Sequence, residues 1–145
     1  MKILLLALHL SAVGMWLGCV ITEALFERAL LGKGREQELL LSSLHKRVDL
    51  VVEIPAFLGV LITGLLMLPH AASSTIFMVK LGFGLLALAA NIVCVGIVFK
   101  RAKAANTGDW DSFAQLDHLQ HKIGAVVLIG LLVALGCGLY LLAHS

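Results

Sequence analysis

Four long apolar runs limit what this sequence can fold into. They span roughly residues 3–26, 49–68, 76–99 and 113–142, and each reaches the ~20 residues that a helix needs to cross a bilayer. They lack the alternation of barrel strands, and backbone polar groups in hydrocarbon are satisfied within helices. Since 60% of the residues are hydrophobic, we predict an all-α fold, an integral membrane antiparallel four-helix bundle with a single domain over residues 1–145.

The first run resembles a signal peptide because it follows Met1 and Lys2. It continues beyond the length of a signal-peptide core and ends with Glu23 and Glu27, without a small-residue cleavage motif. We therefore expect it to be retained as the first helix.

The connections between the runs carry further signals. Residues 35–47 form a charged, amphipathic segment whose leucines can lie at the membrane interface, and the second helix is predicted to grow out of it. Pro55 lacks an amide proton and is predicted to kink or loosen that helix near Glu53. Ser112 and Gln115 have the spacing of a capping box for the fourth helix.

The basic residues predict the orientation. Of the eleven lysines and arginines, all but Lys2 and Lys80 flank the first and third connections. The positive-inside rule makes that end cytoplasmic, so both termini lie outside a bacterial-type cytoplasmic (inner) membrane that the chain crosses several times. The expected partner is the lipid bilayer, and a homo-oligomer is compatible with these runs. No basic tract has the length or aromatic content typical of nucleic-acid binding.

Ionisable side chains gather at the predicted cytoplasmic end of the bundle. Such groups are costly at membrane depth and therefore mark functional sites. Carboxylates and imidazoles on facing helices bind Zn, Fe, Mn or Cu in helix bundles. We predict a transition-metal site there. Its candidate ligands are Glu23, Glu27, His45, Asp49, Glu53, Asp117, His118 and His121.

Two other interpretations of this cluster stay open. In the first, an interfacial salt-bridge network forms, with the acids neutralised by the nearby basic residues Arg28, Lys46, Arg47 and Lys122. In the second, His45 and either His118 or His121 are axial ligands of a b-type haem. The three cysteines, Cys19, Cys94 and Cys137, are predicted to be packing residues, since they form no CxxC pair.

Three segments carry a resemblance to known membrane proteins. These are LHLSAVGMWLG, KRVDLVVEIPAFLGVLITGLLML and MVKLGFGLLALAANIVCVGIVFKR. They resemble the short four-helix membrane protoporphyrinogen oxidases and the wider group that contains the copper-resistance protein D membrane domains. The resemblance implies haem b within the bundle and a functional pair formed by His9 and Lys80. The chain differs at two places, with Asn91 where the oxidases have a histidine and Asp117-His118 where they have Asn-Glu.

Three functions follow as hypotheses. The first is a membrane metalloprotein with a redox or metal-handling role. The second, implied by the resemblance, is a haem b oxidoreductase that acts on a porphyrin or a quinone. The third is a non-catalytic assembly subunit whose polar residues only hold the helices together.

Overall fold

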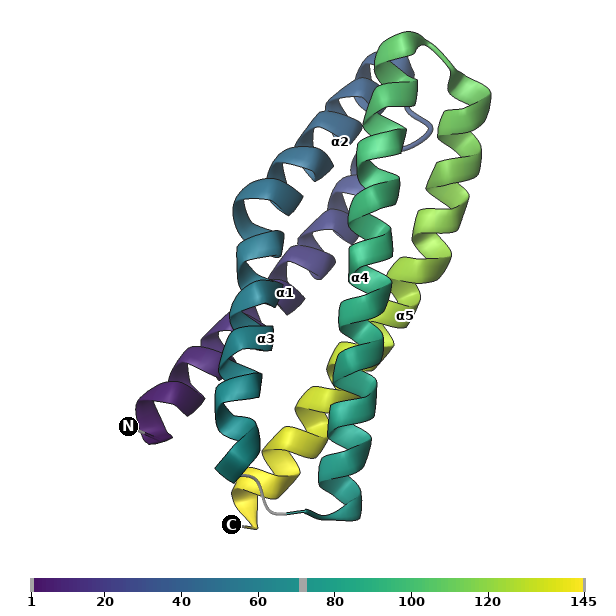
Figure 1. Ribbon diagram of the computed structural model, residues 1–145. Coiled ribbons are helices and arrows are strands. Elements are labelled where there is room, and N and C mark those ends of the chain that lie inside the picture. Colours follow the sequence, from purple (N-terminus) through teal and green to yellow (C-terminus); the bar gives the residue numbers. More distant parts are fainter. Residues whose placement is uncertain (1, 71–72, 145) are drawn as a thin grey trace.

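The computed structural model describes residues 2–70 and 73–144 and confirms the predicted all-α four-helix bundle (Figure 1). Four helical spans are long and apolar enough to cross a membrane, so the chain is a multi-pass membrane protein. The described residues contain no strand. The elements are α1 (Lys2–Leu30), α2 (Arg35–Val48), η1 (Asp49–Glu53), α3 (Ile54–Met67), η2 (Leu68–His70), α4 (Thr75–Thr107) and α5 (Trp110–Ala143).

The helices run beyond the apolar stretches because glycines and caps, not hydropathy, set their ends. Gly32 and Gly108 have φ values of 71° and 74°, a left-handed backbone that favours glycine and stops the preceding helix. Asp109, and not the predicted Ser112, caps α5, since its Oδ1 accepts a hydrogen bond from the Ser112 amide at 3.1 Å. Hydrogen bonding with Ser112 lowers the pKa of the Asp109 carboxyl.

The second span is one continuous helix with a π-helical turn in its middle. Residues 35–48 form α2, from which the second span continues as predicted, and α2 packs on α4 and buries Leu41 and His45. The prediction that Pro55 loosens the helix is confirmed, because the π-helical turn η1 ends two residues before it. This turn carries Asp49 at its start and Glu53 at its end, and both are buried.

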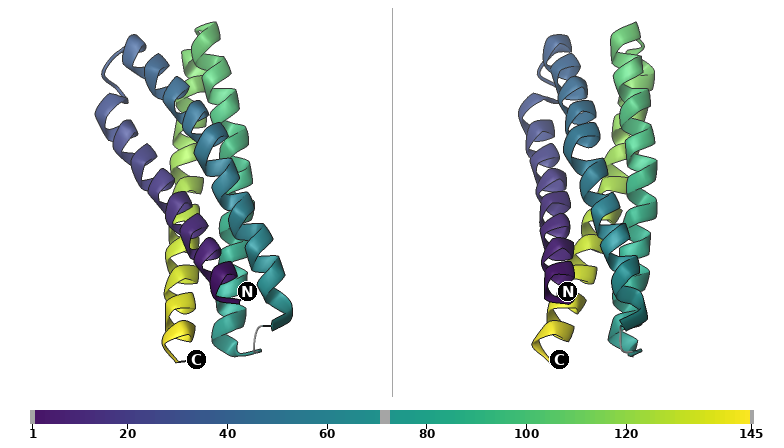
Figure 2. Two further views of the ribbon diagram at one scale, coloured as in Figure 1. Left: turned by 90° about the vertical axis from the view of Figure 1, so that its left-hand side faces the viewer. Right: turned by 60° about the vertical axis from the view of Figure 1, so that its left-hand side comes forward.

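The four spans pack as two pairs, α1 with α3 and α4 with α5, which Figure 2 shows from two directions. The pairs are joined where α2 contacts α4 and where α1 contacts α5. The main core contains Trp16, Phe57, Ala87 and Val127. Both chain ends lie at one end of the bundle and the α1–α2 and α4–α5 connections at the other, as Figure 1 shows, so the polar residues near these connections meet.

Candidate functional site

The structure divides seven of the eight predicted ligands into two layers and does not bring them to one centre. Three carboxylates form the inner layer, which we name the carboxylate triad: Glu23, Asp49 and Glu53. The outer layer surrounds a buried arginine, and we name it the Arg101 network: Arg101, Glu27, His45, Asp117, Gln120 and His121. The predicted ligand His118 belongs to neither group.

The carboxylate triad brings together three acids from two helical spans. Glu23 lies on α1, whereas Asp49 and Glu53 are the first and last residues of the π-helical turn η1. One oxygen from each lies within 4.8 Å of the other two. Asp49 is 1% and Glu53 3% exposed, and neither Asp49 oxygen has a hydrogen-bond partner. No ion pair involves these acids in the described part of the chain.

Two buried donors stand beside the triad. The indole Nε1 of Trp16 and the amide Nδ2 of Asn91 have no partner at hydrogen-bonding distance, and both side chains interact with Glu53. The position of Trp16 could have been expected from the sequence, because it precedes Glu23 by seven residues on one helical face. The buried thiols of Cys19 and Cys94 also lie within electrostatic range of the triad, so they border the site as well as fill the core.

Arg101 organises the outer layer from α4, where its side chain is fully buried. Its Nη1 donates hydrogen bonds to Glu27 at 3.2 Å and to Asp117, and its Nη2 lies 2.7 Å from the His45 Nδ1. A guanidinium only donates, so the Nδ1 of His45 accepts and carries no proton. The remaining ring proton is on Nε2, which faces the Glu23 carbonyl oxygen at 3.4 Å. His45 is therefore neutral, with both ring nitrogens engaged.

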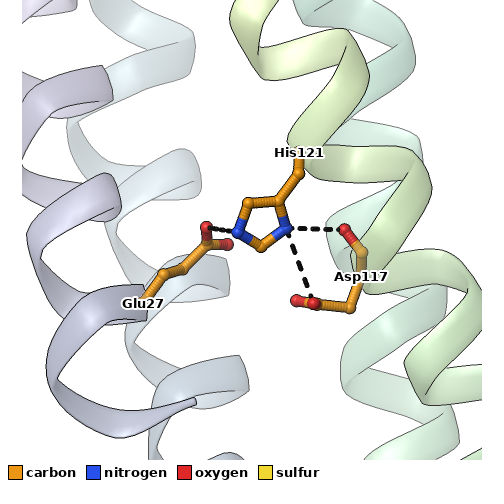
Figure 3. Close-up of side chains that lie close together, drawn as sticks. All are labelled: Glu27, Asp117 and His121. Atoms are coloured by element: carbon orange, nitrogen blue, oxygen red, sulfur yellow. Dashed lines mark hydrogen bonds and ion pairs between the residues drawn. The ribbon is translucent and has the colours of Figure 1, made fainter.

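His121 links α5 to α1 across this layer (Figure 3). Its Nδ1 lies 2.9 Å from the Asp117 carbonyl oxygen and is the donor there. Its Nε2 lies 2.7 Å from a carboxylate oxygen of Glu27, a hydrogen-bond length. Tetrahedral ligands bonded to a metal at about 2.1 Å would lie about 3.4 Å apart. The His121–Glu27 contact is shorter than that separation, and Glu27, Asp117 and His121 also form a second group whose candidate ligand atoms lie within 4.8 Å of one another.

Ion pairs connect the members of the outer layer. Arg101 pairs with Glu27 and Asp117, and His121 contacts the same two acids. The interpretation as a salt-bridge network thus fits this layer, with Arg101 as its cation. In the described part of the chain, none of the four predicted basic partners joins an ion pair. They are Arg28, Lys46, Arg47 and Lys122.

The arrangement does not pair His118 with His45 as haem ligands. His118 is exposed on α5 and lines a pocket of about 330 Å³ beside Arg35 and Trp110. His45 is buried, and Arg101 and the Glu23 carbonyl oxygen are at its two ring nitrogens. The side chains therefore differ in exposure and surroundings, and a haem between them would require His45 to leave both contacts.

His9 and Lys80 lie in the other half of the bundle, away from the acids. His9 is buried, and its Nδ1 lies 2.8 Å from the Thr63 hydroxyl on α3. Lys80 is half-buried on α4, and its Cε lies 3.4 Å from where a Cβ would stand on Gly138 of α5. The two side chains thus contact different partner helices, α3 and α5 respectively, but they lie close enough to interact electrostatically.

Comparisons with protein-family models, with curated proteins and with solved structures found no match to this chain. The resemblance to the four-helix oxidases stays an expectation from the sequence.

Proposed function

We propose that this protein binds a divalent metal ion at the carboxylate triad. The observation that supports this proposal is the convergence of the half-buried Glu23 with the buried Asp49 and Glu53, with carboxylate oxygens within 4.8 Å of one another. Both oxygens of Asp49 are buried without a hydrogen-bond partner. Buried polar groups are otherwise almost always satisfied, so these oxygens point to a ligand or to bound protons.

The energetics of the triad favour a bound cation. Moving a carboxylate out of water costs several kcal/mol even after relaxation, and like charges in one site oppose ionisation of their neighbours. Arg101 is already engaged by Glu27 and Asp117, so it does not form an ion pair with the triad. A divalent cation offsets two of the three charges and supplies the missing partner of Asp49. Protons are the competing occupants.

The donor set favours a hard metal. Carboxylate oxygens suit Mn²⁺, Mg²⁺ and Ca²⁺, whereas thiolates and imidazoles favour Zn and Cu. Among the transition metals predicted from the sequence, Mn²⁺ therefore fits best. Trp16 and Asn91 are placed to orient Glu53 as outer-shell donors, as ligating carboxylates commonly require. A metal-handling role in the membrane is the simplest function for such a site.

Equilibrium dialysis of metal-stripped protein against Mn²⁺, followed by elemental analysis, tests the proposal. We expect about one Mn²⁺ per chain and at least tenfold weaker binding in Asp49→Asn and Glu53→Gln, because each removes a charged ligand. The control is His118→Gln, since His118 is exposed and outside both layers. The variant His121→Gln is also expected to retain Mn²⁺. If both triad variants bind Mn²⁺ as tightly as the wild-type protein does, the metal lies elsewhere.

Haem b is the second candidate, supported by the resemblance to the four-helix oxidases. The favouring observation is that His9 is buried inside the bundle, far from the acids that characterise the other end. A Soret band in the visible spectrum of the purified protein would support this candidate. Its loss in His9→Ala or Lys80→Met, with the helical content unchanged, would assign the two residues to it. Protein that binds neither haem nor metal would favour an assembly subunit.

We also propose the orientation that the basic residues predict, in a bacterial-type cytoplasmic membrane. Nine of the eleven lysines and arginines lie toward the end with the α1–α2 and α4–α5 connections, which the positive-inside rule makes cytoplasmic. A reporter fused after the last residue is expected to be active only outside the membrane. The same reporter inserted at Gly108, between α4 and α5, is expected to be active only in the cytoplasm. The reverse pattern would contradict the orientation.

A further inference from the structure

A pocket of about 350 Å³ opens beside the end of α1, next to the Arg101 network. Its lining residues are Ala24, Glu27, Arg28, Leu31 and His121. Glu27 occupies a special position there, because it lines the pocket and also accepts a hydrogen bond from the buried Arg101. The pocket thus reaches the first carboxylate of the polar interior.

On α1, Glu27 lies between the pocket and Glu23, which belongs to the carboxylate triad. The two residues are four positions apart on α1, so they lie on one helical face about 6 Å apart along the axis. Their carboxylates interact electrostatically, and Glu23 in turn interacts with Asp49 and Glu53. A cation that reaches Glu27 from the pocket is therefore one helical turn from the triad.

We propose that this pocket is the entrance to the triad and that Glu27 is the transient ligand that passes the metal ion inward. This inference rests on the proposed function of the triad. Glu27 turns from His121 toward a hydrated cation in the pocket, and the ion then exchanges onto Glu23. His121, whose side chain is 45% exposed, moves outward during this step. Arg101 keeps its positive charge beside Glu27, which disfavours a resting cation there and favours its transfer.

The second pocket at this end provides a comparison. It is of similar size, about 330 Å³, and lies between the start of α2 and the start of α5. Phe113 and Asp117 line it, and Asp117 is held by Arg101, so the arginine stands between this pocket and the triad. An exposed alanine lines each pocket, Ala24 in the first and Ala114 in the second. Substitution of either alanine by phenylalanine fills its pocket and leaves every carboxylate in the chain.

Stopped-flow kinetics of Mn²⁺ binding, with chelator-driven dissociation, tests the entrance. In Ala24→Phe we expect the association and dissociation rate constants to fall together by at least tenfold with Kd unchanged, because a blocked passage slows both directions equally. Ala114→Phe is expected to keep wild-type rates. Glu27→Gln is expected to slow association in the same way. If Ala24→Phe does not fold, Ala24→Leu provides the same readout with a smaller side chain.

Two results would overturn the entrance. One is an Ala24→Phe protein with the wild-type association rate, and the other is equal slowing by Ala114→Phe. Both differ from a failure of the proposed function, in which wild-type protein binds no Mn²⁺ or binds it regardless of Asp49.

Discussion

Replacing Arg101 by methionine is expected to destabilise the bundle by about 3–5 kcal/mol, the cost of removing one partner from a buried ion pair. Arg101 is fully buried and donates to Glu27, Asp117 and His45 from three other elements. Methionine fills a similar volume but leaves two carboxylates without their cation. The free energy of unfolding, measured by SDS titration in mixed micelles with helical content as the signal, checks this expectation.

Two controls separate the loss of charge from the loss of a long side chain. Lys103→Met, at an exposed position on the same helix, is expected to change the free energy of unfolding by less than about 0.5 kcal/mol. Adding Glu27→Gln and Asp117→Asn to Arg101→Met is expected to recover at least half of the lost stability, because a buried network without charges needs no counter-ion. If Arg101→Met lowers the free energy of unfolding no more than Lys103→Met does, the Arg101 network does not stabilise the bundle.

Hydropathy and backbone chemistry were sufficient to predict the fold. The four apolar runs identify the four spans, since each is long enough to cross a bilayer and contains no alternating pattern. Pro55 predicts the loosened turn before it, because proline removes a hydrogen bond in the preceding turn whatever the neighbours are. Hydropathy does not predict the ends of the helices, since charged residues extend α1 and α4 beyond the apolar stretches.

The division of the site into two layers could not be predicted from depth alone. Sequence spacing shows which residues share a face of one helix, but the rotation of each helix against its neighbours depends on packing. Arg101 follows Lys100 at the end of an apolar run, where basic residues predict only the orientation. The sequence nevertheless indicates that Arg101 faces inward, because Asn91, Cys94 and Arg101 lie on one face of the helix at spacings of three and seven.

The same reasoning explains the place of His118. The buried positions at the start of α5 are Phe113, Asp117 and Gln120, at spacings of four and three. His118 follows Asp117 directly, so it lies about 100° away around the helix and is exposed. The imidazole of His118 suggests a metal ligand, whereas the position of His118 around the helix places its side chain outside the bundle.

Gly130→Leu is expected to be the most damaging substitution of a small residue, since it separates the α4–α5 pair. A Cβ at position 130 would lie 3.0 Å from the Cβ of Ala87 and 3.0 Å from the carbonyl oxygen of Phe83. Ala87 is fully buried, and the carbonyl belongs to the backbone of α4, so neither gives way easily. Small residues permit such close approach between membrane helices. Overpacking of this kind costs about 1–3 kcal/mol, and the larger leucine places the loss at the upper end.

The matched control for this substitution is Gly136→Leu, on the same helix. A Cβ at position 136 would meet no atom within 4 Å, and leucine has a higher helix propensity than glycine by up to about 1 kcal/mol. Gly136→Leu is therefore expected to leave the free energy of unfolding unchanged or to raise it, in the same SDS titration. Gly130→Leu should also weaken Mn²⁺ binding, because displacement of α4 moves Asn91 and Arg101 relative to the acids of α1. Equal stability of the two leucine variants would mean that α4 and α5 do not approach each other at Gly130.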